Sequence, residues 1–148
     1  YTWHFWTAIM DRNRLIDQLR IHEGVEKTVY NDSEGIPTIG GGRNLRDRGL
    51  SDDEIDYLLS NDIDIVVNEL DKVMPWWKDL DEVRQRVLCD LVFNLGMPRF
   101  SGFKKSISYM KQQMWDQAAD ELLDSKWARQ VGRRAHTLSE MMRTGNDF

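Results

Sequence analysis

Apolar residues recur at helical spacing along most of the chain, and the first such run predicts a short amphipathic helix. Asp11 is a preferred N-cap residue, and Leu15, Ile16 and Leu19 follow it on one face of the expected helix. Gly24 ends the run, because glycine readily adopts the left-handed conformation found after the last turn of a helix. The pattern therefore predicts a helix from about residue 11 to residue 23.

The next stretch changes from helical spacing to β-favouring fragments. These fragments are 28–30 and 38–39, and the turn-forming residues 31–35 separate them. Gly40, Gly41 and Gly42 then follow in succession, which permits a bulge or a close approach of another group to the backbone. We expect a single β-hairpin here.

The remainder of the chain is expected to be helical. Ser51 and Glu54 form a capping box, which predicts the start of a long amphipathic helix of about 20 residues that stops at Pro75. Apolar spacing predicts further helices from Asp79 or Asp81 to Gly96, and near 104–112, 115–124 and 133–142, with 100–103 as a connector and short turns elsewhere.

These elements predict an α+β fold that is mostly helical, with a small hairpin lobe, a long connecting helix and a helical lobe. A chain of 148 residues fits one domain. The expected divisions of 1–148 are an arm at 1–12, the hairpin lobe with the first helix at about 13–50, the connecting helix at about 51–74 and the helical lobe at about 75–148. A cleft between lobes is a common place for a ligand site.

Composition narrows the function only slightly. The chain is 41% hydrophobic and 30% charged, as in ordinary globular proteins, and its net charge is −5. Nucleic-acid binders normally carry a basic face, so we expect no nucleic-acid partner. Cys89 is the only cysteine, which excludes an internal disulfide, and its apolar surroundings favour a buried inert thiol over a nucleophile.

The aromatic opening of the chain suggests an arm rather than a membrane span. Residues 1–10 include Trp3, Phe5 and Trp6, but the run is shorter than the ~20 apolar residues of a span and has no basic region typical of a cleaved signal. Two interpretations remain, an arm that packs on the body of the protein and one that makes weak contact with a membrane surface.

Glu23 and Asp32 are the candidate pair for catalysis. Cleavage of a glycosidic bond needs a protonated acid at the leaving oxygen and commonly a second carboxylate. Glu23 lies at the expected C-terminus of a helix, where the negative end of the dipole disfavours its anion, whereas Asp32 lies among amides and hydroxyls that favour the ionised form. A surface glutamate and a turn-stabilising aspartate are the alternative interpretation.

The spacing of Glu23, Asp32 and Thr38 resembles the Glu/Asp/Thr triad of phage-type lysozymes, glycoside hydrolase family 24. The resemblance covers roughly residues 13–147. It rests on the blocks Leu19-Arg-Ile-His-Glu-Gly24, Val29-Tyr-Asn-Asp-Ser-Glu-Gly35, Thr38-Ile-Gly-Gly-Gly42, Val83-Arg84, Phe93-Asn-Leu-Gly96, Phe100-Ser-Gly-Phe103, Trp115-Asp-Gln-Ala-Ala119, Ser125-Lys-Trp127, Arg134-Ala135 and Arg143-Thr-Gly145.

The resemblance implies a lysozyme-like fold and a role for each matching residue. Glu23 matches the general acid, Asp32 the carboxylate that assists water or stabilises the oxocarbenium-like state, and Thr38 a hydroxyl at the attack site. Arg134 matches an arginine that pairs with the catalytic glutamate. The positions that match the saccharide-binding residues are Phe93, Asn94 and Ser106, while Trp127 matches a tryptophan expected to pack beneath the site.

The activity implied is that of an endolysin, a muramidase that hydrolyses the β-1,4 bond between N-acetylmuramic acid and N-acetylglucosamine and so lyses the host cell. Peptidoglycan is then the partner, a holin is needed for release from the host cytoplasm to the periplasm and cell wall, and the protein is expected to be a monomer. The alternatives are a lytic transglycosylase, or a non-catalytic wall-binding or virion module. The stereochemical outcome and the role of Asp32 remain open.

No cofactor or metal is expected, because His4, His22 and His136 are scattered singly and the triple-glycine run lacks the spacing of a phosphate loop. The chain also departs from its expected family in two ways. Arg43 stands where many members have histidine, and the connection from Arg43 to Leu50 is short.

Overall fold

The computed structural model describes residues 9–148, and its internal contacts divide the chain into two compact units that meet in sequence after Ile55. Each unit is described by itself. The aromatic residues for which packing or membrane contact is expected lie outside the described residues. The proposed division into an arm, a hairpin lobe, a connecting helix and a helical lobe stays a prediction.

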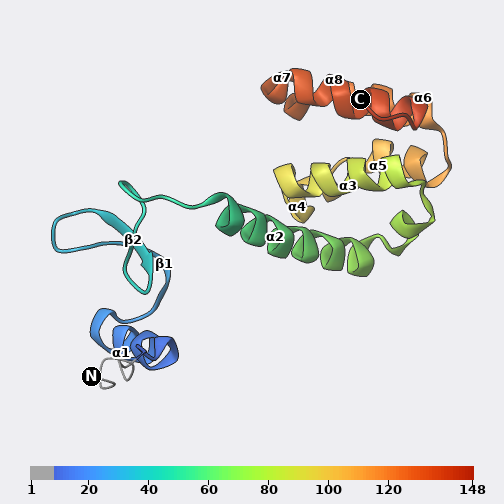
Figure 1. Cartoon of the computed structure of the whole chain (residues 1–148). Coiled ribbons are helices and arrows are strands. Elements are labelled where there is room, and N and C mark those ends of the chain that lie inside the picture. Colours follow the sequence, from blue (N-terminus) through green and yellow to red (C-terminus); the bar gives the residue numbers. More distant parts are fainter. Residues whose placement is uncertain (1–8) are drawn as a thin grey trace, which may run out of the picture. The chain divides into compact units, whose positions relative to one another are not determined.

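The first unit consists of one helix and a small antiparallel sheet (Figure 1). Helix α1 spans Arg12–Glu23, and the three strands are β1 at Glu26–Asn31, β2 at Pro37–Gly40 and β3 at Arg43–Asn44, in the order β1-β2-β3. The predicted helix and hairpin are confirmed. Strand β3 was not predicted, because two residues are too few to show an alternating pattern.

Both ends of α1 follow from its capping residues. The Asp11 side chain accepts a hydrogen bond of 3.0 Å from the backbone N–H of Arg14, and Gly24, with φ +76°, donates its N–H to the carbonyl of Arg20. None of the residues of α1 is buried, and Ile16 is 50% exposed. The described part of the first unit therefore does not by itself bury the apolar face predicted from the sequence.

Helix α2, at Asp52–Val73, begins in the first unit and continues into the second. Its start is the predicted capping box, because the backbone N–H of Ser51 donates to Glu54 Oε1 over 2.8 Å and the N–H of Glu54 donates to Ser51 Oγ over 3.2 Å. The helix ends before Pro75, as expected. A 3₁₀ turn, η2 at Pro75–Asp79, follows it.

The rest of the second unit is helical, with α3 in the layer between α2 and α8 in Figure 1. The elements are α3 at Glu82–Leu95, α4 at Met97–Ser101, α5 at Lys104–Lys111, α6 at Trp115–Leu123, α7 at Lys126–Val131 and α8 at Arg133–Thr144. The mostly helical α+β class is confirmed. Two short helices, α4 and α7, replace an expected connector and an expected turn, because pieces of five or six residues carry too little periodicity to detect.

One hydrophobic core organises the second unit. Its largest fully buried side chains are Leu70, Leu88, Leu91, Phe100, Met110, Leu122 and Met142, which come from α2, α3, α4, α5, α6 and α8. Cys89 is partly buried beside this core, and burial raises the pKa of its thiol, with a smaller contribution from the charge of Asp90. This environment agrees with an inert thiol.

Arg84 ties α3 to the end of α8. Its Nε donates to the carbonyl of Met142 over 2.7 Å and its Nη2 to the carbonyl of Arg143 over 3.1 Å, while its guanidinium lies 3.9 Å from the ring centroid of Trp115. These bonds satisfy carbonyls that the end of a helix leaves free. Gly145, with φ +71°, follows the helix, and a Cβ there would come 2.8 Å from Arg84 Nη1.

Two further observations concern residues 9–148. Within this range, no helix combines the length and apolar character needed to cross a lipid bilayer. The same residues contain no group of three or more histidine, cysteine, aspartate or glutamate side chains arranged to hold a metal ion.

Candidate active site

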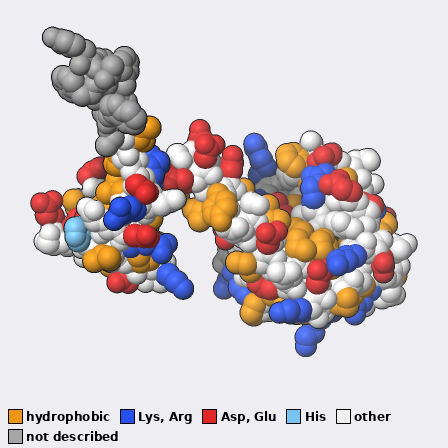
Figure 2. All heavy atoms as spheres, turned by 60° about the horizontal axis from the view of Figure 1, so that its bottom comes forward, with side chains coloured by type: hydrophobic (Ala, Val, Ile, Leu, Met, Phe, Trp, Pro, Cys, Tyr) orange, Lys and Arg blue, Asp and Glu red, His pale blue; other side chains and the backbone are white. Residues whose placement is uncertain are grey.

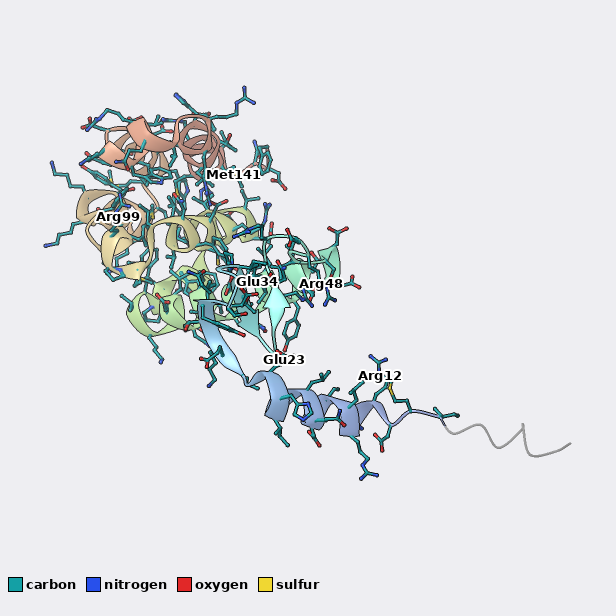
Figure 3. All side chains as sticks on the ribbon, turned by 90° about the vertical axis from the view of Figure 1, so that its left-hand side faces the viewer. Arg12, Glu23, Glu34, Arg48, Arg99 and Met141 are labelled. Carbon is teal, nitrogen blue, oxygen red and sulfur yellow. The ribbon has the colours of Figure 1, made fainter. Side chains whose placement is uncertain are left out.

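Glu23 is the last residue of α1, and its carboxylate lies against the turn between β2 and β3. Figure 3 shows Glu23 where α1 gives way to β1. A Cβ built on Gly42 would come 3.3 Å from Glu23 Oε2 and 3.5 Å from its Cδ. Gly42 also has φ +100°, a conformation that side chains disfavour. The predicted close approach at the triple-glycine run is therefore the approach of the Glu23 carboxylate.

Asp32 forms the turn between β1 and β2. Its Oδ1 accepts hydrogen bonds from the backbone N–H groups of Glu34 and Ile36, over 2.8 and 2.9 Å. Both bonds use one oxygen, so Oδ2 is not needed for the turn. The side chain thus shapes the turn while keeping one oxygen for other partners.

Thr38 lies on β2 and is buried, with 4% of its surface exposed. Its Oγ1 donates to the carbonyl of Ile36 over 2.8 Å, and its Cα pairs with Tyr30 on one side and Asn44 on the other. The hydroxyl proton is therefore committed to the backbone. The oxygen can still accept a hydrogen bond.

Arg43 has a structural role within the first unit. Its Nη1 donates to Glu54 Oε1 over 2.8 Å and to the carbonyl of Gly49 over 3.0 Å, and its Nη2 forms an ion pair with Glu54 Oε2. These bonds join β3 to the first turn of α2. Hydrogen bonds from Arg43 first, and from Ser51, lower the pKa of Glu54 to about 2.

The second unit carries an open groove of about 680 Å³ between α2, α3 and α8. Its walls are largely apolar, with Ile63 and Met141 among them; Met141 is labelled in Figure 3. Phe93 and Arg134 both line it, so the structure brings these two predicted site residues together. Phe93 is 45% exposed and is therefore not part of the core.

Apolar side chains also reach the surface of α2, where Figure 2 shows them among charged groups.

Arg134 pairs within the groove with Asp90. Its Nε donates to Asp90 Oδ1 over 2.9 Å, and Nη2 donates to the same oxygen. Both side chains are 40% exposed, so this pair contributes little to stability. A pairing of Arg134 with Glu23 stays a prediction.

Asn94 and Ser106 lie outside this groove, and both hydrogen bond within the second unit. Asn94 is exposed, and its Oδ1 accepts a bond of 2.7 Å from Trp127 Nε1. Trp127 itself is buried, as expected of a residue that packs beneath a site. Ser106 is only 2% exposed and donates its hydroxyl to the carbonyl of Ala118 over 2.8 Å. Saccharide contact by Asn94 and Ser106 stays a prediction.

Asp90 is the partner of Arg134 in the groove, and the sequence analysis did not identify it as a site residue. A signal was present, because Arg86, Asp90 and Phe93 recur at intervals of four and three residues and so share one face of α3. The sequence prediction for this helix used its apolar repeat and assigned no role to Arg86 or Asp90. Only the position of α8 shows that they line a groove.

Comparison with known proteins identifies the family of the chain. The family model for phage lysozymes matches residues 20–143, which include Glu23, Asp32, Thr38 and Arg134. The chain therefore belongs to the phage lysozyme family. This assignment places it among lysozyme-type peptidoglycan hydrolases.

Similar proteins come from different sources. The chain is 26% identical to "Probable T4-type lysozyme 2" of Dictyostelium discoideum, an alignment that covers 88% of this chain and 94% of that protein. It is 28% identical to an endolysin of Salmonella phage P22, with 73% of this chain and 77% of the other covered. It is also 26% identical to the pre-baseplate central spike protein Gp5 of Enterobacteria phage T4, over 89% of this chain and 28% of that protein.

Proposed function

We propose that the chain is an endolysin, a muramidase that hydrolyses the β-1,4 bond between N-acetylmuramic acid and N-acetylglucosamine in bacterial peptidoglycan. The observation that carries this proposal is the placement of the Glu23 carboxylate against Gly42, beside a hairpin that bears Asp32 and Thr38. Membership of the phage lysozyme family supports it.

Glu23 is the general acid in this mechanism. It donates its proton to the glycosidic oxygen as the bond to the anomeric carbon breaks, so the leaving sugar departs as a neutral alcohol. The end of α1 positions this carboxyl group against the turn at Gly42. Arg134 then pairs with Glu23 after it has lost its proton, which stabilises the carboxylate that forms.

Asp32 and Thr38 serve the attacking water. The free oxygen of Asp32 either accepts a proton from the water or stabilises positive charge at the anomeric carbon, and Thr38 Oγ1 accepts a hydrogen bond that orients the water. Phe93, Asn94 and Ser106 bind saccharide. The protein works as a monomer on peptidoglycan, and a holin gives it access from the host cytoplasm to the wall.

The decisive experiment is the variant Glu23→Gln in a turbidity assay on purified peptidoglycan. Gln has nearly the same shape but no acidic proton, so clearing should fall at least about a thousandfold. The far-ultraviolet circular dichroism and melting temperature should stay unchanged, since Glu23 is exposed. Normal clearing by this variant would exclude the mechanism.

Product analysis separates hydrolysis from its chemical alternative. Water attack leaves reducing N-acetylmuramic acid ends, whereas a lytic transglycosylase leaves anhydro ends. We expect reducing ends, because Asp32 and Thr38 are present to place a water molecule. A parent protein that binds walls but produces neither end would instead be a non-catalytic wall-binding or virion module.

A further inference from the structure

The charge of the chain is unevenly distributed along the sequence. The whole protein has a net charge of −5 and 25 acidic residues, yet none of them falls between Leu91 and Trp115. The same stretch contains four basic residues, Arg99, Lys104, Lys105 and Lys111. It forms the end of α3, then α4 and α5. Arg99, labelled in Figure 3, lies at the outer side of the helical unit.

A second groove of the helical unit lies on this basic stretch. It has a volume of about 310 Å³, and its walls come from the end of α2, η2, α4 and α5. The lining residues are Val73, Met74, Trp76, Ser101, Lys104, Ile107, Ser108 and Lys111, none of them acidic. We call this the Trp76 groove. It shares no residue with the groove that holds Arg134.

The groups along the Trp76 groove are ordered by helix geometry. Lys104, Ser108 and Lys111 occupy positions i, i+4 and i+7 of α5, so they share one face of the helix. Lys111 Nζ lies 5.8 Å from the ring centroid of Trp76, which is partly buried. Both lysines are exposed, and neither forms an ion pair with any of residues 9–148.

This set of groups matches the chemistry of an anionic saccharide. An indole ring offers an apolar face to the C–H face of a sugar, serine hydroxyls bond to sugar hydroxyls, and lysines attract carboxylates. No arginine lines the groove, so its lining offers no bidentate guanidinium contact of the kind that favours phosphate. Peptidoglycan combines sugars with carboxylates, because its stem peptides end in them.

We propose that the Trp76 groove is an accessory binding site for peptidoglycan strands, with Trp76 against a sugar and Lys104 and Lys111 on stem-peptide carboxylates. This inference rests on the proposed function for its choice of ligand. The site holds the protein on an insoluble substrate between cleavage events. Its charge offsets the repulsion between an acidic protein and an anionic wall.

The test measures binding without hydrolysis, in the Glu23→Gln background. The probe is purified insoluble peptidoglycan freed of phosphate-containing polymers, and the bound fraction is measured by sedimentation. Lys104→Gln/Lys111→Gln should raise the dissociation constant about fivefold, the order expected for two exposed charge pairs. The matched control is Lys126→Gln/Arg129→Gln, which removes the same charge from exposed positions of α7 and should change binding less than about twofold.

Three results would overturn the proposal. One is an equal loss in both double variants, which would indicate general electrostatic attraction. Another is unchanged binding by Trp76→Leu, which keeps apolar packing but removes the aromatic face; we expect about a threefold loss. The last is a lysine effect that persists on insoluble peptidoglycan whose carboxylates have been converted to neutral amides, because carboxylates would then not be the ligand.

Two comparisons identify the kind of partner and separate this proposal from the enzymatic one. In the first comparison, double-stranded DNA is added as a competitor to protein bound on peptidoglycan. If DNA released the parent protein but did not release the Lys104→Gln/Lys111→Gln variant, the groove would be a nucleic-acid site, which would contradict the inference. In the second comparison, binding is measured in the Glu23→Gln background, so the result does not depend on hydrolysis. A parent protein without hydrolytic activity would therefore overturn the proposed function while leaving the binding result readable.

Discussion

The carboxylate of Glu23 lies so close to Gly42 that a Cβ at residue 42 would come 3.3 Å from Oε2. This contact joins the end of α1 to the turn between β2 and β3. It means that the position of the candidate acid depends on a residue with no side chain. The backbone at Gly42, with φ +100°, also favours glycine.

Gly42→Ala should therefore cause a large loss of activity and only a modest loss in the free energy of unfolding. The methyl group displaces the Glu23 carboxylate, so we expect a tenfold to hundredfold loss of peptidoglycan clearing, the order that follows a misplaced catalytic group. It also strains the backbone, which should lower the free energy of unfolding by about 1–2 kcal/mol. Turbidity assays and urea unfolding measure the two effects. Gly40→Ala is the matched control, because Gly40 also has a positive φ, +70°, but its Cβ meets nothing within 4 Å. Comparable activity losses in both variants would refute the importance of this contact.

Arg134 and Asp90 offer a test of whether the arginine serves the site or only its ion pair. The pair is 40% exposed on both sides, so either Arg134→Gln or Asp90→Asn should cost less than about 1 kcal/mol of stability. Activity should differ. Arg134→Gln should lose about tenfold or more if Arg134 stabilises Glu23, whereas Asp90→Asn leaves the arginine in place and should lose little. Equal losses in steady-state hydrolysis would contradict the proposed role of Arg134.

The Arg43–Glu54 pair predicts a pH dependence of stability. The pKa of Glu54 is lowered to about 2, below the ordinary glutamate value of about 4.3, so the native state favours the charged form. Its contribution is then fully present above about pH 5 and is lost as the pH falls from there towards 2. Melting temperatures of the parent and Glu54→Gln should differ most near pH 7 and converge near pH 2. A constant difference across this range would exclude the linkage.

Gly145 predicts a steric clash with Arg84 that adds to a backbone cost. Gly145 has the left-handed conformation, with φ 71° and ψ 12°, which costs alanine about 1–2 kcal/mol by itself. The methyl group of Gly145→Ala also pushes against the Arg84 guanidinium, which is held by the carbonyls of Met142 and Arg143. Displacing those hydrogen bonds should add about 1–3 kcal/mol to the loss in the free energy of unfolding, measured by urea unfolding. A total loss no greater than the backbone cost would mean that Arg84 moves freely.

Much of the fold could be predicted from the sequence, because helix ends depend on interactions between residues close together in the chain. The N-cap at Asp11, the capping box of Ser51 and Glu54, and the helix end at Gly96 all form where side chains and backbone lie within four residues of each other. Long apolar repeats gave α2 and α3 their approximate extents. The elements that were missed, β3, η2, α4 and α7, are at most six residues long, which is too short for a periodic pattern to reveal them.

Part of the candidate site was likewise predicted from the sequence, and part was found only in the structure. The sequence by itself determined the candidates Glu23, Asp32 and Thr38, because their spacing and helix-end context are local, and it determined the acid-free stretch from Leu91 to Trp115. Only the tertiary structure decided that Gly42 receives the Glu23 carboxylate and that Asp90 bonds Arg134. The reason is physical: residues 19 and 44 positions apart meet only when elements pack, and packing depends on the whole core rather than on any local pattern.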